Sequence, residues 1–378
     1  MGKKGNPPLS SLVPKHHFAG LSFFRQPPLV NWKFTDSVLF TAYDFYRTSS
    51  FWVERVIRQG MTLKQALIDM GFPKENRSLA DTGVFSIEAR KAGIARELGI
   101  EPDIELTNEQ IFHAYSVSGA DLFVSPDEIV VPDDGKEEVN EKISTIKDNF
   151  LDLLEIVPPS KVLAVIQAPD EPTAQELFDF YKSHGITTFA AGGLIPLWKS
   201  SAKKLRDMLQ YIRELTDGYW LHAFGLPRIR LLPYYIHMIG IDSVDSSMLL
   251  YLSAKKRYLE GLKAIPVRKA DFSKCQCSGC SSMKKKPVAH SYQFFINLYI
   301  HNVHAATNLA LESQEKSKLD NYIDKVAEYR QKRRKKKETR QKRKIPQNAW
   351  MNAKTLHREK YMTKKKKVDS KEKAKRRP

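Results

Sequence analysis

Short apolar runs alternate with longer amphipathic stretches between residues 32 and 250, the pattern that repeated strand–helix units produce. The amphipathic stretches place apolar residues at helical spacing and are long enough for crossover helices between parallel strands. A further strand is expected in the Pro-rich stretch 21–32. The other strand-like runs lie at 38–45, 79–86, 120–128, 161–169, 187–194, 219–227 and 238–246.

This rhythm predicts the fold class and the division of the chain. Seven or eight strand–helix units in about 230 residues fit an α/β fold of the (β/α)₈ TIM-barrel type better than an open doubly wound sheet. We assign the barrel to residues 21–265, after a flexible leader at 1–20. Residues 266–327 hold all the cysteines and an aromatic, helix-like stretch, which predicts a small appended subdomain with a terminal helix. Residues 328–378 form a separate basic tail.

The tail carries almost all of the formal net charge of +19. It holds 23 of the 62 Lys and Arg residues but only 5 of the 43 Asp and Glu residues, so the predicted fold itself is near neutral. A segment so rich in like charges and so poor in apolar residues is expected to be disordered when free. Such a tail suits binding to nucleic-acid phosphates, and on composition alone it equally suits a solvated tail or a localisation signal.

The hydropathy pattern also predicts the cellular compartment of the protein. No run of about 18 consecutive apolar residues occurs, and the first ten residues, MGKKGNPPLS, lack the apolar centre of a secretory signal. We therefore expect a cytoplasmic protein that has no membrane partner.

Three cysteines cluster within six residues in the spacing C-x-C-x₂-C: Cys275, Cys277 and Cys280. An odd trio cannot form a self-contained set of disulfides, whereas three thiolates and one imidazole complete a tetrahedral zinc site. The fourth ligand is expected among His290, His301 and His304, and we select His301 because a helix beginning near residue 291 can present it to the cysteines. Such a thiolate-rich site is usually structural, since catalytic zinc keeps one position open for water. The competing interpretation is a chance cluster of buried or redox-active cysteines.

Polar residues and glycines follow the ends of most of the predicted strands. In a (β/α)₈ barrel these ends and the loops after them build the active site. Each residue taken singly has an ordinary structural explanation, because Asp after a strand commonly caps a helix and Gly commonly forms a turn. The glycine patterns of phosphate loops and dinucleotide-binding folds are absent, which argues against those classes. The residues concerned are Asp81, Asp127, Gln167, Gly192, Gly193, Gly225, Asp242 and Asp245.

Over about residues 79–310 the chain resembles the tRNA-guanine transglycosylases of the queuine and archaeosine type. The most specific feature is the cysteine trio followed by the His301-Asn302 pair. Members of that family have a (β/α)₈ barrel with a zinc subdomain, in agreement with the pattern described above. The motifs that carry the resemblance, in their order, are ADTGVFS, GADLFVSPDE, VIQA, AGGL, HAFG, DSVDS and C-x-C-x₂-C…HN.

The resemblance implies that a guanine in a nucleic acid is exchanged for a 7-deazaguanine derivative by double displacement. Asp245 would attack C1′ of the target nucleotide to form a covalent ester, and Asp81 would act as the acid and base. Asp242 competes with Asp245 as nucleophile, and we assign it a structural hydrogen-bonding role instead. Asp127 would bind the N–H edge of the base, Phe85 would stack on it, and its other polar atoms would be read by Gln167 and the backbone of Gly193 and Leu194.

The nucleic acid itself is left open by the resemblance, with tRNA favoured, because a related branch performs the same exchange on DNA. The target base must leave its helical stack to reach the pocket. Lys255, Lys256 and Arg257 follow the proposed nucleophile and could bind phosphates, although an ordinary solvated helix face explains them as well. One structural zinc ion per chain and a homodimer are also implied.

Two further hypotheses compete with an active transglycosylase. A non-catalytic binding subunit that partners an active homologue would be expected to have lost the acidic pair, whereas Asp81 and Asp245 are both present. A barrel hydrolase of unrelated chemistry would have no reason to carry the cysteine trio after the barrel. The chain departs from the family pattern after Gly193, where GGLIPLWKS puts the preference for the incoming base in doubt.

Overall fold

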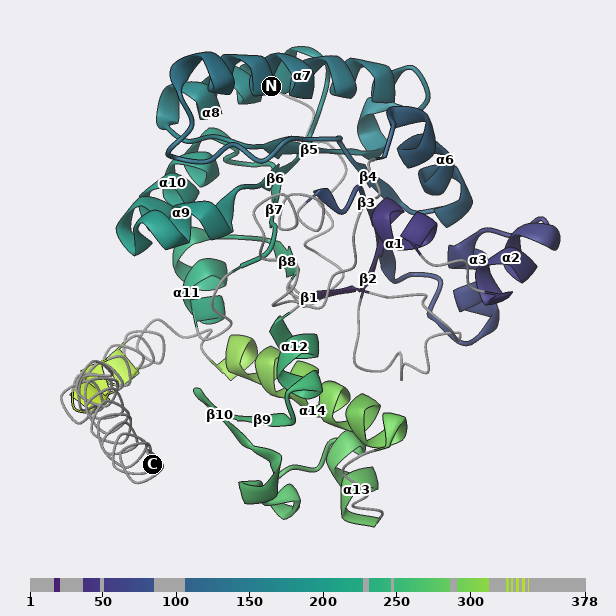
Figure 1. Ribbon diagram of the computed structural model, residues 1–378, viewed down its shortest axis with the longest axis vertical. Helices are drawn as coiled ribbons and strands as arrows, with labels where there is room; N and C mark the ends of the chain where they lie inside the picture. Colours follow the sequence, from purple (N-terminus) through teal and green to yellow (C-terminus); the bar gives the residue numbers. More distant parts are fainter. Residues whose placement is uncertain are drawn as a thin grey trace, which may run out of the picture. The chain divides into compact units, whose positions relative to one another are not determined.

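The structure is a computed structural model in which the chain divides into two compact units, residues 1–319 and 320–378. Within the first unit eight strands and the helices that follow them come before a smaller group of elements (Figure 1). The described residues are 17–20, 37–47, 51–84, 106–226, 231–245, 248–285 and 291–312, with eight more between 324 and 339.

Eight strands form a closed barrel in which every strand is parallel to both neighbours. The last strand pairs with the first, with Phe18 opposite Asp245, which closes the ring. The predicted (β/α)₈ fold is therefore confirmed. The strands are β1 (His17–Gly20), β2 (Ser37–Thr41), β3 (Arg77–Asp81), β4 (Leu122–Val124), β5 (Val162–Ile166), β6 (Thr188–Ala191), β7 (Trp220–Ala223) and β8 (Ser243–Asp245).

The position of one strand differs from the sequence prediction. The eighth strand was expected within residues 21–32 and is instead β1 at His17–Gly20, inside the stretch assigned to the leader. Residues 21–32 themselves lie outside the described residues. The other observed strands are shorter than the predicted runs, because the ends of those runs form loops or the first turn of a helix, as at Ala42 after β2.

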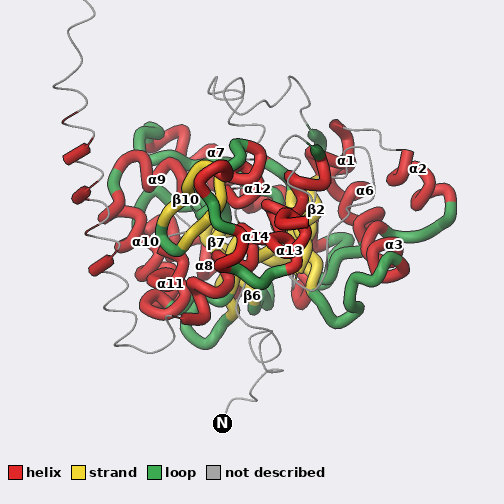
Figure 2. Tube along the Cα trace, turned by 90° about the horizontal axis from the view of Figure 1, so that it is seen from below, coloured by secondary structure: helices red, strands yellow, loops and turns green. Residues whose placement is uncertain are grey.

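Helices surround the strands, as Figure 2 shows for the described part of the barrel. Several begin at a residue whose side chain accepts a bond from the first turn, such as Thr107 before Gln110 and Asp170 before Thr173. The helices of the barrel are α1 (Ala42–Arg47), α2 (Phe51–Arg58), α3 (Leu63–Asp69), α6 (Asn108–Ser118), α7 (Lys136–Leu154), α8 (Glu171–Ser183), α9 (Leu194–Ser200), α10 (Ala202–Leu215), α11 (Leu232–Tyr234) and α12 (Met248–Ala254).

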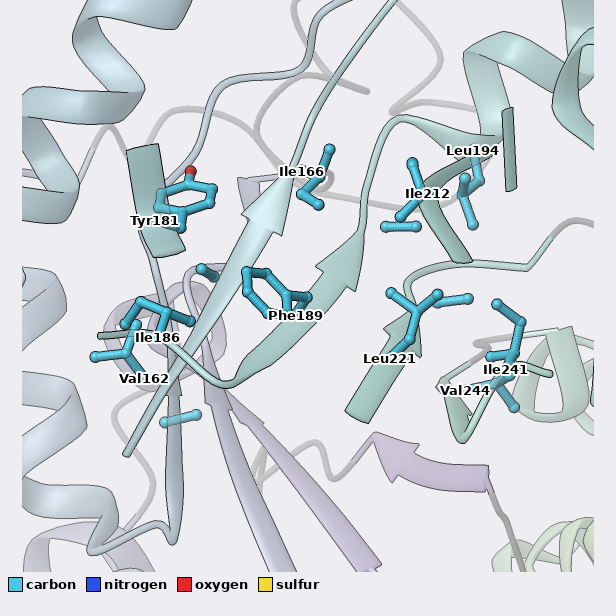
Figure 3. Packing of buried hydrophobic residues seen from close by; sticks show 14 of the residues in the cluster. Val162, Ile166, Tyr181, Ile186, Phe189, Leu194, Ile212, Leu221, Ile241 and Val244 are labelled. Carbon is cyan, nitrogen blue, oxygen red and sulfur yellow. The ribbon is translucent and has the colours of Figure 1, made fainter. Parts of the chain in front are cut away.

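The strands bury their two faces in different layers. Val162 and Ile166 of β5 and Phe189 of β6 pack with Tyr181 of α8 and Ile212 of α10, between the strands and the helices (Figure 3). The alternate positions point into the barrel, where a second cluster fills the interior. Its members are Leu39, Leu79, Leu122, Val124, Leu163, Val165, Ala190 and Trp220. Residues in register with this inner set therefore point into the barrel as well.

The small subdomain consists of an antiparallel pair, β9 (Arg257–Glu260) and β10 (Lys263–Pro266), with α13 (Ser278–Lys285) and α14 (Tyr292–Glu312). Tyr258 of β9 packs with Cys280 and with Phe294 of α14, so the antiparallel pair contacts the cysteine segment. After α12 the chain changes direction at Lys256, whose φ is +52°, and continues as strand β9.

In the second unit the described residues between 324 and 339 are helical. Lys and Arg have good helix propensity, and Lys332 pairs with Glu328 at the i,i+4 spacing with 3.5 Å between Nζ and Oε2. The predicted disorder of 340–378 concerns residues outside those described. Among the described residues no helix is long and apolar enough to span a bilayer.

Candidate active site and metal centre

Four of the polar residues singled out in the sequence meet at one end of the barrel. Asp81 is the last residue of β3 and Asp245 the last of β8, while Asp127 and Gln167 follow β4 and β5. The strands are parallel, so these positions lie at the same carboxyl end. Asp81 is in register with the interior residue Leu79, and both therefore point inward.

Asp81 has an unusual environment for a carboxylate. The backbone N–H of Gly83 donates to its Oδ2 over 3.0 Å. Burial, and after it the negative charges of Asp127 and Asp245, raise the pKa of Asp81 to about 8. This carboxyl group is therefore mostly protonated at neutral pH, which suits a group that gives up and recovers a proton.

Asp127 and Gln167 form a buried pair in which Gln167 Nε2 donates to Asp127 Oδ2 over 2.6 Å. Burial raises the pKa of Asp127 to about 6, and the Gln167 bond opposes that shift. Asp127 is therefore ionised at neutral pH while Asp81 is not. Gln167 Oε1 is buried and has no hydrogen-bond partner among the described residues. The pair thus offers a carboxylate and an amide oxygen, which are acceptors for a ligand rich in N–H groups.

Two glycines make room beside this pair. Gly193 has the left-handed φ of +63° directly before α9, and a Cβ there would lie 2.7 Å from Gln167 Oε1. A Cβ on Gly192 would lie 2.6 Å from Gln167 Nε2. Leu194 is buried as the first residue of α9, where backbone N–H groups have no acceptor within the helix. Phe85, predicted to stack on the base, lies outside the described residues.

Asp245 is held through one of its two oxygens. The Gly225 N–H donates to Oδ1 over 2.6 Å, and Nε2 of His222 lies 3.6 Å from the same atom. His222 is fully buried, and its Nδ1 is 2.7 Å from the hydroxyl of Ser243. His222 was not among the residues predicted from the sequence. The signal for it was the alternation of Trp220 and His222 along β7 and of Phe224 just after it.

Asp242, the competing candidate nucleophile, makes structural contacts instead. Its carboxylate lies 3.1 Å from Nη1 of Arg213 and accepts the backbone N–H of Leu221 over 2.9 Å. These bonds connect β8 to α10 and β7 on the side away from the barrel interior. The predicted structural role of Asp242 is therefore confirmed.

The three basic residues predicted to bind phosphates have different surroundings. Lys255 and Lys256 are exposed, and the Lys255 ammonium lies 5.8 Å from the centre of the Tyr251 ring. Arg257 is instead tied to the subdomain, since its guanidinium donates to the carbonyl of Ala264 over 2.5 Å. Beside Lys256 is a hollow of about 190 Å³. Its walls include Ser253, Ser291, Tyr292, Phe294 and Phe295.

The predicted zinc ligands form one cluster. The three cysteine sulfurs and a ring nitrogen of His301 all lie within 4.8 Å of one another. His301 Nδ1 is 3.2 Å from Cys280 Sγ and 3.7 Å from Cys277 Sγ, while its Nε2 lies 2.9 Å from the carbonyl oxygen of Leu259. Because that carbonyl can only accept, Nε2 carries the proton and the lone pair of Nδ1 faces the sulfurs. The donor set and this orientation both fit a metal ion held by three cysteines and one histidine.

The surroundings of the cluster hold it rigidly. The Tyr258 ring stacks on His301 with 3.7 Å between centroids and 9° between planes. Asn302 accepts the Leu259 N–H and donates to the carbonyl of Arg257, which fixes β9 to α14. Gly279 admits no side chain, because a Cβ there would lie 2.2 Å from the Asn297 carbonyl. The hydrogen bond from Cys280 lowers the pKa of the Cys277 thiol, which favours a thiolate ligand.

Comparison with known proteins agrees with this geometry. No curated protein sequence matches the chain. The family model described as queuine tRNA-ribosyltransferase matches residues 62–335, a span that includes most of the barrel, the acidic residues at its carboxyl end and the whole metal cluster. The chain belongs to the queuine tRNA-ribosyltransferase family.

Proposed function

We propose that this glycosyltransferase exchanges a guanine in tRNA for a 7-deazaguanine derivative through a covalent intermediate on Asp245. The observation that carries the proposal is a pair of carboxyl groups in two different environments at one end of the barrel. Asp81 has its pKa raised to about 8, while Asp245 accepts a short bond from the Gly225 N–H, as an ionised carboxylate does. Two carboxyl groups in two roles are what double displacement at a sugar carbon requires.

In the first step the Asp245 carboxylate attacks C1′ and the bond between C1′ and N9 of guanine breaks. The departing electron pair goes to the guanine, which takes the proton of Asp81. In the second step the Asp81 carboxylate removes the proton from the glycosidic nitrogen of the incoming base. That nitrogen attacks C1′, the ester bond breaks, and both aspartates return to their starting states.

The base lies beside Asp127 and Gln167 in this proposal. A guanine-type edge presents N–H donors, which Asp127 and the unpartnered Gln167 Oε1 can accept. The glycine backbone at Gly193 lets the base approach closely, the N–H of Leu194 donates to its carbonyl, and Phe85 stacks on its face. A residue larger than glycine at 193 would meet Gln167 Oε1.

The metal in the subdomain is zinc in our proposal, held by Cys275, Cys277, Cys280 and His301. Four protein ligands complete the coordination of zinc and give a structural ion, whose contribution is to hold the cysteine segment to α14. The residues near it have the same effect, since Asn302 and His301 both bond to β9. No chemical step of the exchange involves this site.

The nucleic acid is bound in part beside the subdomain. Lys255 and Lys256 contact phosphates, and the exposed Tyr292 and its neighbour Phe295 offer apolar surface to an unpaired nucleotide. Arg257 supports this surface through its bond to Ala264. The family description, queuine tRNA-ribosyltransferase, favours tRNA over DNA as the polymer. A homodimer is also part of the proposal, and light scattering of the purified protein tests it.

The test is incorporation of labelled guanine into tRNA and into duplex DNA in parallel, with the wild type, Asp245→Asn and Asp242→Asn. We expect the wild type to incorporate guanine into tRNA and Asp245→Asn to lose this activity. The folded fraction of Asp242→Asn should retain it. Exchange into DNA alone would show that DNA and not tRNA is the substrate, and would leave the proposed double displacement unchanged. No exchange into either polymer by folded, zinc-loaded wild type would favour the non-catalytic subunit.

A further inference from the structure

We propose that His222 is a positioning residue which, together with the Gly225 N–H, holds Oδ1 of Asp245 and leaves Oδ2 to attack the sugar. This inference rests on the proposed function, since it takes Asp245 as the nucleophile. It adds a residue outside the acidic pair and identifies the oxygen atom that forms the ester.

The His222 ring has little freedom to move. The side chain is fully buried in the barrel interior at the carboxyl end of β7. Trp220 lies 6.0 Å from it in a stacked arrangement, and Phe224 packs edge-on with 4.5 Å between centroids. The Ser243 hydroxyl, 2.7 Å from Nδ1, fixes the rotation of the ring about its remaining axis. These contacts keep the edge that carries Nε2 directed at Asp245.

The bond to Ser243 also selects the tautomer. A hydroxyl can donate or accept, so Nδ1 alone does not determine where the proton lies. The carboxylate of Asp245 can only accept, and it lies 3.6 Å from Nε2. The consistent arrangement therefore places the proton on Nε2, with the Ser243 hydroxyl donating to Nδ1. Contacts of this length in a free site commonly shorten when substrate binds.

Both contacts to Asp245 are made on the same oxygen. The Gly225 N–H donates to Oδ1 over 2.6 Å, and the His222 ring faces Oδ1 too. Among the described residues no hydrogen bond to Oδ2 is present. An oxygen that already accepts a hydrogen bond is a weaker nucleophile than one that does not, and Oδ1 accepts the bond from Gly225, so in this proposal the attack comes from Oδ2.

The same donors act in both steps of the exchange. When Oδ2 bonds to C1′ and the guanine leaves with the proton of Asp81, Oδ1 becomes the carbonyl oxygen of the ester. When the incoming base displaces the ester, the electron pair of the C1′–Oδ2 bond returns to the carboxylate. The N–H groups of Gly225 and His222 then stabilise the negative charge as it develops on Oδ1. His222 thus speeds the release of Asp245 as well as orienting it.

The experiment compares His222→Leu with His222→Gln and Ser243→Ala in the full-length, zinc-loaded protein. Leu removes the donor at similar volume, whereas the Gln Nε2 can replace the ring Nε2–H. The readouts are kcat for exchange, KM for the incoming base, and the yield of enzyme–RNA adduct after rapid denaturation. We expect kcat to fall about 10- to 100-fold in His222→Leu with KM changed less than about 3-fold, to recover most of its value in His222→Gln, and to be intermediate in Ser243→Ala.

Two results would overturn the role of His222 and are distinct from failure of the proposed function. One is an active wild type with unchanged kcat in His222→Leu. The other is equal loss in the Leu and Gln variants together with a lowered Tm, which would mean that His222 only fills space. A wild type without exchange or adduct on any polymer would instead overturn the proposed function, and this role with it.

Discussion

The two polar clusters of the chain differ in how completely their members are satisfied. In the metal cluster both ring nitrogens of His301 have partners, Asn302 is bonded at its carbonyl and amide ends, and an aromatic ring covers the site. At the carboxyl end of the barrel, burial and like charges raise the pKa of two aspartates, and the buried Gln167 Oε1 has no partner among the described residues. A polar network in which every donor and acceptor is paired stabilises the fold. Buried polar groups without partners, or with a raised pKa, cost free energy in the free protein, and a bound ligand can recover that free energy by pairing with them.

Breaking the metal cluster should have the largest effect, because it removes part of the fold. In Cys280→Ser the protein is expected to lose its metal and to unfold with a Tm lower by about 10 °C or more, since structural zinc contributes several kcal/mol to folding. Metal content by mass spectrometry and a thermal scan by circular dichroism measure both. His304→Ala is the matched control, because His304 lies on the same helix outside the cluster. An unchanged Tm without metal would contradict the structural role.

Breaking the acidic cluster should do the opposite: reduce activity and raise stability. We expect the rate of exchange by Asp81→Asn to fall about 10²- to 10⁴-fold, because no group then moves the proton.

The pKa of Asp81 is about 8 in the folded protein against 3.8 ordinarily, so ionisation of Asp81 lowers the free energy of unfolding increasingly from about pH 4 to pH 8. Asparagine avoids that cost, and the gain in free energy of unfolding should be about 1–3 kcal/mol at pH 9 and smaller at pH 5. A Tm lowered at pH 9 would contradict this explanation.

The two raised pKa values also predict how exchange depends on pH. Asp127 must be ionised to accept N–H groups, and its pKa is about 6, whereas Asp81 must be protonated at the start, and its pKa is about 8. The profile of kcat/KM should therefore be bell-shaped, with limbs near pH 6 and pH 8 and about a tenfold loss per pH unit beyond them. Asp127→Asn should remove the acidic limb. A profile flat from pH 5 to pH 9 would contradict the assignment of both roles.

The smallest expected effect comes from the backbone beside Gln167. Gly193→Ala places a Cβ 2.7 Å from Gln167 Oε1 and should raise KM for the incoming base about tenfold. Gly218→Ala is the control, since Gly218 also has a positive φ, of +77°, but no atom lies within 4 Å of a Cβ there. If both variants change KM equally, backbone strain rather than crowding of Gln167 is the cause.

The sequence predicted those parts of the molecule that depend on local pattern. The strand–helix rhythm predicted the barrel, and the cysteine spacing predicted the ligands from Cys275 onward, because both signals lie within short segments. The first strand was misplaced, since a four-residue strand such as His17–Gly20 has too little periodicity to be recognised. The alternative explanation of Lys255, Lys256 and Arg257 as a solvated helix face does not hold for Arg257, because it lies in β9, which pairs with β10.

The role of His222 could not be predicted from local sequence pattern. Histidine on a strand is ordinarily a core residue, and its value here comes from Ser243 and Asp245, which reach it from another strand of the barrel. The raised pKa of Asp81 likewise depends on its burial in the folded protein and then on the charge of Asp127, 46 positions away in the chain. Such properties arise from closure of the barrel and not from the order of residues.

The most direct test of the account is to identify the residue that becomes covalently attached. Wild-type protein is mixed with RNA that carries the target guanine, without incoming base, and is then denatured, digested with nuclease and trypsin, and sequenced by tandem mass spectrometry. We predict a nucleotide remnant on Asp245 within the tryptic peptide 231–255, and none in Asp245→Asn. A remnant on Asp242 in the same peptide, or on Asp81 or Asp127, would contradict the account.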